Sequence, residues 1–227
     1  MLSSPLRPEI DYRTIKLIVG VIALSLGNLT SFFSGTAIAS ISESYYMGGW
    51  AQSTLVGFLF AIAAFLLAYN GLSLSEMVLS KIASVAALGV ALFPCRCGNH
   101  IEIIAYVHAA SAAALFGILA YFCLVFRRRA MAKGHVQAKA RAVVYTLCGS
   151  AILLSILTVA ADGLLGGTLS AQMPRLTFYA ERTALIAFGV SWLIASRVLP
   201  FITREDERFK ILSRLHRANT SDSRAAD

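Results

Sequence analysis

Long uncharged stretches alternate with short polar ones along this chain of 227 residues. Four of these stretches contain no Asp, Glu, Lys or Arg, and they cover residues 17–42, 44–75, 103–126 and 142–161. A helix needs ~20 mainly apolar residues to cross the ~30 Å hydrocarbon layer of a bilayer. Because each stretch reaches that length, the pattern predicts four membrane-spanning helices.

Two shorter apolar stretches, 82–95 and 183–196, predict two further spans. Lys81 and Arg197 lie at their edges, and such long basic side chains can extend to the lipid headgroups while the helix continues into the membrane. The predicted helices therefore cover residues 15–33, 52–70, 77–94, 103–126, 142–165 and 177–199. We expect an all-α integral membrane protein built as a six-transmembrane-helix bundle.

The composition supports a membrane protein. Hydrophobic residues make up 57% of the chain and charged residues 14%, whereas soluble globular proteins have about 45–50% and about 25%. We expect a cytoplasmic N-terminus at 1–14, one transmembrane domain at 15–200 and a basic cytoplasmic tail at 201–227. In the tail, the spacing of Phe209, Leu212 and Leu215 predicts a short interfacial helix, and residues 218–227 are predicted to be disordered.

A cleavable secretion signal at the N-terminus would leave five spans instead of six. Basic residues do precede the first apolar stretch, and an Ala-Ile-Ala sequence follows it at 37–39. The apolar stretch runs from residue 17 to 33, however, whereas the apolar region of a signal has 7–15 residues. The six-span prediction is therefore preferred.

The basic residues divide unequally between the two sides of this predicted topology. The net charge is +8, and 17 of the 20 Lys and Arg residues fall on the side that holds both termini. They are Arg7, Arg13, Lys16, Lys81, Arg127, Arg128, Arg129, Lys133, Lys139, Arg141, Arg197, Arg204, Arg208, Lys210, Arg214, Arg217 and Arg224. Arg96, Arg175 and Arg182 fall on the other side. Basic loops stay in the cytoplasm, so we expect both termini there and an inner-membrane location. The net positive charge is therefore explained by the membrane topology and by attraction to the anionic headgroups of the lipid bilayer. No nucleic-acid partner is predicted.

Small residues recur at four-residue spacing on the fourth predicted helix, at Ala109, Ala113 and Gly117. Such a stripe allows a neighbouring helix to approach closely. We expect that neighbour to belong to the same bundle, with a second chain as the alternative. The oligomeric state itself cannot be deduced from this pattern.

Five polar residues are candidates for ligand binding, because ionisable groups within a bilayer are costly and often functional. They are Glu43, Tyr46, His108, Asp162 and Glu181. All five are predicted at the outer ends of helices or in outer loops, which indicates a polar pocket that opens outward. In it, His108 could exchange protons with Glu181 as its partner. Alternatively, His108 and Glu181 satisfy one another or backbone groups between helices.

Cys95, Cys97 and His100 form a second cluster, within one outer turn. Their spacing is only a weak metal signal, since structural zinc sites usually place two to four residues between cysteines and use a fourth ligand. A disulfide is possible outside the cytoplasm, either between these two cysteines or between chains. We expect a tight turn with free cysteines, no metal and no cofactor. The remaining cysteines, Cys123 and Cys148, fall inside predicted spans.

Several enzyme classes lack their motifs here. No G-x-S-x-G, H-E-x-x-H or G-x-x-x-x-G-K-[ST] sequence occurs in the chain. A bis-histidine haem site is also not expected, because His108 is the only histidine that falls securely inside a predicted span.

Short strings along the chain resemble a bacterial membrane family. These strings are SISESYY at 40–46, VGFLFA at 56–61, ALFP at 91–94, His108 with the following Ser111 and Ala112, and Glu181 with AFGVSW at 187–192. In this order they resemble the uncharacterised domain-of-unknown-function 998 type, six-helix proteins distantly similar to Frag/DRAM/Sfk-type membrane proteins. The resemblance covers about residues 15–200 and implies the fold and the membrane location, but no activity. The sequence departs from the family pattern at Cys95–Cys97 and in the basic tail.

Three functions fit these observations. The first is a non-enzymatic bundle that binds, senses or moves a lipid or small amphiphile through the outward-facing polar pocket. The second is a membrane-embedded hydrolase or transferase acting on a lipid headgroup, with His108 as general base, although no nucleophile can be recognised. The third is a scaffold or assembly protein whose basic loop and tail recruit partners. We favour the first and expect no enzymatic activity.

Overall fold

The computed structural model describes residues 12–97, 100, 104 and 106–207, and this part of the chain contains helices but no strands. Six of the helices are long: α1 (Tyr12–Phe33), α3 (Gly49–Ala68), α4 (Leu74–Leu92), α5 (Val107–Met131), α6 (Val136–Leu164) and α8 (Leu176–Ser196). Two short helices, α2 (Ser44–Met47) and α7 (Thr168–Gln172), lie in connections. Two 3-10 turns, η1 (Pro200–Ile202) and η2 (Glu205–Glu207), follow α8.

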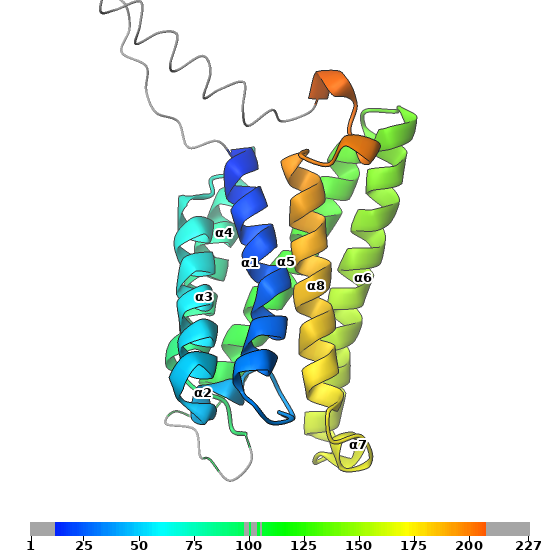
Figure 1. Ribbon diagram of the computed structural model, residues 1–227. Helices are drawn as coiled ribbons and strands as arrows, with labels where there is room; N and C mark the ends of the chain where they lie inside the picture. The colour runs from blue at the N-terminus through cyan, green and yellow to red at the C-terminus, as the bar shows by residue number, and fades with distance from the viewer. Residues whose placement is uncertain (1–11, 98–99, 101–103, 105, 208–227) are drawn as a thin grey trace, which may run out of the picture.

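The long helices run up and down beside one another, so that successive helices point in opposite directions (Figure 1). The start of α1, the α5–α6 turn and the 3-10 turns after α8 lie at one end of the bundle, which we call the basic end. The short helices α2 and α7 lie at the opposite end, which we call the loop end. The first and last described residues therefore lie at the same end.

Five of the long helices, α1, α3, α4, α5 and α6, are long and apolar enough to cross a membrane. The prediction of an all-helical membrane bundle is confirmed to that extent. The remaining long helix, α8, has 21 residues and carries Glu181 and Arg182 in its second turn. It packs against α1 and α6 and is an integral part of the bundle (Figure 1).

The predicted helix boundaries lie within three residues of those in the structure, except at the start of α5, which is Val107 instead of residue 103, and at the α5–α6 connection. We expected a loop at 127–141, but α5 continues to Met131 and α6 begins at Val136. Charged residues mark where a helix leaves the hydrocarbon, not where it ends, and Arg, Ala, Gln and Lys are good helix formers. The turn comes at Gly134, whose φ of 75° suits glycine, and the His135 side chain accepts a hydrogen bond from the Ala138 N–H at 3.2 Å.

Close packing of α1 against α8 depends on two glycines. A Cβ placed on Gly189 would lie 2.7 Å from Leu24 Cγ and 2.8 Å from the Gly20 carbonyl oxygen. Next to this contact, towards the basic end, the Trp192 side chain is fully buried among aromatic rings from the end of α3, from α5 and from α8. Its ring centroid lies 5.4 Å from those of Tyr69 and Phe188, and 6.2 Å from those of Phe122 and Phe126.

The predicted stripe of Ala109, Ala113 and Gly117 on α5 does not mediate packing within the bundle, contrary to our expectation. Ala109 and Ala113 are exposed, and a Cβ on Gly117 would meet no atom within 4 Å. The stripe therefore faces outward. The close approach on this helix is made instead by Ser111, whose hydroxyl would collide with a Cβ at Gly89 of α4.

Parts of the predicted terminal regions lie outside the described residues. These are the cytoplasmic N-terminus up to residue 11, the proposed interfacial helix containing Phe209, Leu212 and Leu215, and the predicted disordered segment at 218–227. Within the described part of the tail, η1 and η2 fold back on the basic end of the bundle (Figure 1).

Candidate functional site

Glu181 fixes the connection between α1 and α2. Its carboxylate accepts a hydrogen bond from the Ile41 backbone N–H, and also from the hydroxyls of Ser40 at 3.3 Å and Ser42 at 3.1 Å. The side chains of Ile38 and Ile41 are buried in an apolar cluster with Phe178 of α8. Because the buried loop backbone needs hydrogen-bond partners, Glu181 supplies the acceptor that allows this loop to pack on α8.

Two further residues at the start of α8 bind the same loop. The Arg175 side chain donates to the Ile38 carbonyl at 3.2 Å, and the Phe178 backbone N–H donates to the Ala39 carbonyl at 2.9 Å. One turn later, Arg182 donates to the Asn28 side chain of α1 at 2.6 Å. The polar residues at this end of α8 therefore hold α1 and its following loop in place.

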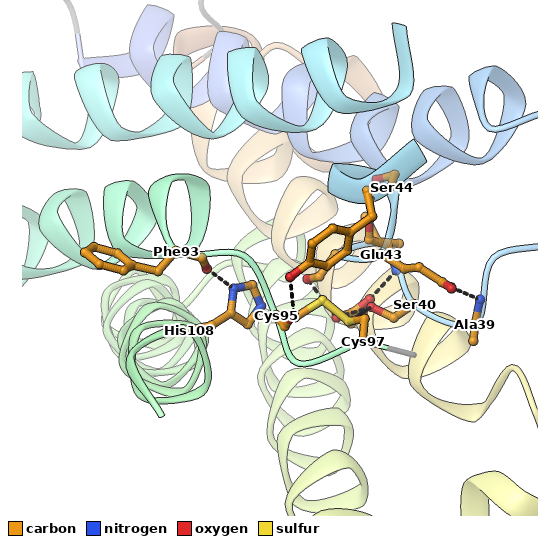
Figure 2. Close-up of a disulfide and its surroundings, with 12 residues drawn as sticks. Ala39, Ser40, Glu43, Ser44, Phe93, Cys95, Cys97 and His108 are labelled. Carbon is orange, nitrogen blue, oxygen red and sulfur yellow. Dashed lines mark hydrogen bonds between the residues drawn. A yellow bond between two sulfur atoms is a disulfide. The ribbon is translucent and has the colours of Figure 1, made fainter. Parts of the chain in front are cut away.

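Glu43 stabilises the same loop locally. Its carboxylate accepts a hydrogen bond from the Ala39 backbone N–H at 2.6 Å (Figure 2). Although the loop contains both Glu43 and the residues that bind Glu181, the two carboxylates have different donors. This geometry does not test the predicted ligand pocket or the role of Glu43 in it. Both stay predictions.

Tyr46 and Cys95 connect α2 to the segment after α4. The Tyr46 hydroxyl donates to the Cys95 carbonyl at 2.7 Å, and its ring stacks on that of His100 with centroids 3.7 Å apart. Cys95 and Cys97 form a disulfide (Figure 2). The expectation of free cysteines in this turn is therefore wrong. With both sulfurs bonded to each other, the alternative metal site of Cys95, Cys97 and His100 would first require their reduction.

His108 and Asp162 also have protein partners. The Nδ1 atom of His108 lies 2.7 Å from the Phe93 carbonyl oxygen, joining the start of α5 to the end of α4 (Figure 2). Asp162 accepts hydrogen bonds from the backbone N–H groups of Leu169 at 2.9 Å and Ser170 at 3.0 Å, and so caps α7. His108 and Glu181 thus bind different segments, which fits the alternative in which each satisfies neighbouring protein groups.

A lateral groove lies between α4 and α5. It has a volume of about 740 Å³, and its lining side chains are apolar except for Lys81 and Ser111. It runs from Lys81, whose ammonium binds Asn70 and the last carbonyls of α3, to Phe93 and Val107 beside His108. Over the 12 residues from Lys81 to Phe93, a helix rises ~18 Å, slightly more than half of a ~30 Å hydrocarbon layer.

The basic end contains two carboxylates that our sequence analysis did not single out. Glu76 is buried and accepts hydrogen bonds from both terminal nitrogens of Arg129, from Ser73 at 2.9 Å and from Tyr69 at 3.4 Å. Ser73 caps the start of α4 by accepting the Glu76 backbone N–H at 3.3 Å, and the Ser-x-x-Glu spacing typical of a capping box is readable in the sequence. Glu207, by contrast, lies in a basic tail with no local pattern that indicates its partners.

These features define the class of the chain as an α-helical bundle with five membrane-length apolar helices, a lateral apolar groove and charged clusters at one end. Comparison with known protein families, characterised proteins and solved structures finds no match. The resemblance to the domain-of-unknown-function 998 type therefore stays a prediction.

Proposed function

We propose that this chain is a six-span protein of the bacterial inner membrane that binds the acyl chain of an anionic amphiphile in the α4–α5 groove. In this proposal α8 is the sixth span, and both the N-terminus and the C-terminus lie in the cytoplasm. Support comes from the alternating helix directions and from the packing of α8 between α1 and α6 (Figure 1). Described basic residues at the basic end, among them Arg129, Lys133 and Arg141, also support it.

The groove is the observation that carries the binding proposal. Small residues on both helices, including Gly89 of α4 and Ala110 of α5, leave an open apolar channel on the side of the bundle. Its length of ~18 Å, from Lys81 to the end of α4, gives room for one extended acyl chain. Among the described residues that line the groove, Lys81 is the one that carries a charge, and its position at one end favours a negatively charged headgroup there.

From the sequence, we expected the ligand to contact the five polar residues Glu43, Tyr46, His108, Asp162 and Glu181. In the present proposal, His108 is the one among them that adjoins the ligand, because it binds the carbonyl of the groove residue Phe93. Glu43, Tyr46, Asp162 and Glu181 serve to hold the loops that join the helices. The ligand class, a lipid or small amphiphile, is unchanged.

Photo-crosslinking tests this proposal. Membranes that contain the full chain are exposed to an anionic lipid with a photoreactive acyl chain, and labelled peptides are identified by mass spectrometry. We expect labelling to concentrate on residues 82–93 and 107–114, and Ala110→Trp to reduce it about tenfold by filling the groove. Leu154→Trp is the matched control, because Leu154 is 64% exposed on α6 and does not line the groove.

Two results would contradict the proposal. The first is equal labelling of all exposed helix faces, which indicates ordinary surrounding lipid. The second is an equal loss of labelling in Ala110→Trp and Leu154→Trp.

A further inference from the structure

Five basic side chains surround Glu207 at the basic end, and we call this group the Glu207 cluster. Its members are Arg13, Lys133, His135, Arg141 and Arg197. Lys133 and Arg141 bind the Glu207 carboxylate directly, Arg141 at 2.9 Å. Arg197 and His135 lie 3.6 Å and 3.7 Å from it, and Arg13 donates to the Glu207 backbone carbonyl at 3.5 Å.

Positive charge in this cluster exceeds negative charge. Four of its members are Lys or Arg, and Glu207 supplies the carboxylate on which they converge. Burial by itself would raise the pKa of Glu207, but the surrounding basic groups, foremost the Lys133 hydrogen bond and the Arg197 charge, lower it to about 2. The field at this position therefore favours an anion strongly enough to outweigh the cost of burial.

The cations and the anion come from different parts of the molecule. Arg13 belongs to α1, Lys133 to the α5–α6 turn and Arg141 to α6, so the helices of the bundle fix their positions. Arg141 is only 2% exposed, and its guanidinium also binds the Ile202 carbonyl at 2.8 Å. Glu207, in contrast, is the last residue of the three-residue turn η2. The bundle thus provides an anion site, and a peripheral turn provides its occupant.

The histidine of the cluster is oriented as a donor. Its Nδ1 accepts the Ala138 N–H, so the hydrogen of neutral His135 is on Nε2, the atom that faces Glu207. Each of the five members of the Glu207 cluster therefore offers a hydrogen-bond donor. A carboxylate has two oxygens to receive them, and three of the basic groups contact the same oxygen, Oε1.

We propose that the Glu207 cluster is a binding site for a phosphate group, which Glu207 occupies in this structure and which a phosphate monoester displaces. A phosphate monoester carries about −1.5 to −2 charge at pH 7 and offers three acceptor oxygens. It neutralises more of the surrounding charge than one carboxylate does, and the forked Arg guanidinium is well suited to it. The site is distinct from the α4–α5 groove and does not depend on occupancy of that groove.

The phosphate group has two sources, a lipid headgroup and free phosphate. The experiment therefore compares the full chain in nanodiscs of phosphatidylcholine alone, of phosphatidylcholine with phosphatidic acid, and of phosphatidylcholine with added inorganic phosphate. Release of Glu207 is followed by the distance between spin labels at Val136→Cys and Arg204→Cys, both exposed positions, with Cys123 and Cys148 replaced by Ala. Phosphatidic acid binding is measured separately by native mass spectrometry.

We expect phosphatidic acid to lengthen the distance between the labels, while phosphatidylcholine alone does not. The same change with inorganic phosphate would identify free phosphate as a source. Glu207→Gln should bind phosphatidic acid about tenfold more tightly, because the competing charge is removed. Arg141→Gln should bind it about tenfold more weakly, and Lys139→Gln, an exposed basic residue near Arg141 on α6, should bind it normally.

The proposal is overturned if Glu207→Gln binds phosphatidic acid no more tightly than the unaltered chain does. Glu207 would then only hold the turn η2 against the bundle. It is also overturned if Arg141→Gln and Lys139→Gln bind equally. The Glu207→Gln comparison decides the matter alone if Arg141→Gln fails to fold.

Discussion

For single buried or partly buried carboxylates, the sequence indicated the hydrogen-bond partners only in part. Glu181 and Glu43 stood out as carboxylates near predicted membrane edges. The donors to Glu181 lie in a loop about 140 residues earlier in the chain and depend on the tertiary fold, whereas Glu43 binds a residue of its own loop. Glu76 is the opposite case, because its partner Ser73 is three residues away and the capping box is a local signal. Its second partner, Arg129, comes from another helix and could not be predicted from spacing.

Replacing Glu181 by Gln tests the role of this carboxylate. The amide has one acceptor oxygen where the carboxylate has two, so at least one of the three donors from the loop loses its partner. We expect the free energy of unfolding to fall by about 1–3 kcal/mol, the cost of leaving a buried polar group unsatisfied. Unfolding in mixed detergent micelles measures the change.

Glu43→Gln is the matched control for this variant. Glu43 accepts one hydrogen bond within its own loop, so its replacement should cost about 1 kcal/mol or less. An equal loss in the two variants would show that Glu181 does not have the special loop-holding role that its contacts indicate.

At the scale of elements, hydrophobic length predicted the existence of the long helices better than where they begin and end. α5 continues past Arg127 and α6 begins before Arg141, because a charged residue can end an apolar stretch without ending a helix. The contact between α1 and α8 was also beyond prediction, because a glycine in a span does not reveal which helix approaches it.

Gly189→Ala tests the α1–α8 contact. The added methyl group would overlap the Leu24 side chain and the Gly20 carbonyl oxygen. The α1 backbone at Gly20 cannot move aside as a flexible side chain can. We expect a loss of about 1–3 kcal/mol from overpacking. Gly57→Ala is the control, because its Cβ would meet no atom within 4 Å; there, better helix propensity should stabilise α3 by about 0.5–1 kcal/mol. Equal effects, measured by the same unfolding assay, would contradict a close α1–α8 approach.

At the scale of the whole molecule, the direction of α8 decides the proposed topology. Its second turn carries Glu181 and Arg182, yet both side chains have partners in α1 or its following loop. Paired in this way, the two charged residues can be accommodated at the outer edge of a span at a lower cost than isolated charges. In the proposed topology, the described basic residues at the opposite end of the bundle are then cytoplasmic, as the charge rule for membrane loops predicts.

Cysteine labelling tests this arrangement in intact cells, with Cys123 and Cys148 replaced by Ala and the Cys95–Cys97 disulfide retained. We expect a membrane-impermeant maleimide to label Met173→Cys, at the loop end, without permeabilisation. Ala132→Cys, in the α5–α6 turn, and Arg204→Cys, after α8, should react only after permeabilisation, because they lie at the basic end. Labelling of Arg204→Cys in intact cells would show that α8 does not cross the membrane, whereas labelling of Ala132→Cys would show that the whole bundle has the opposite orientation.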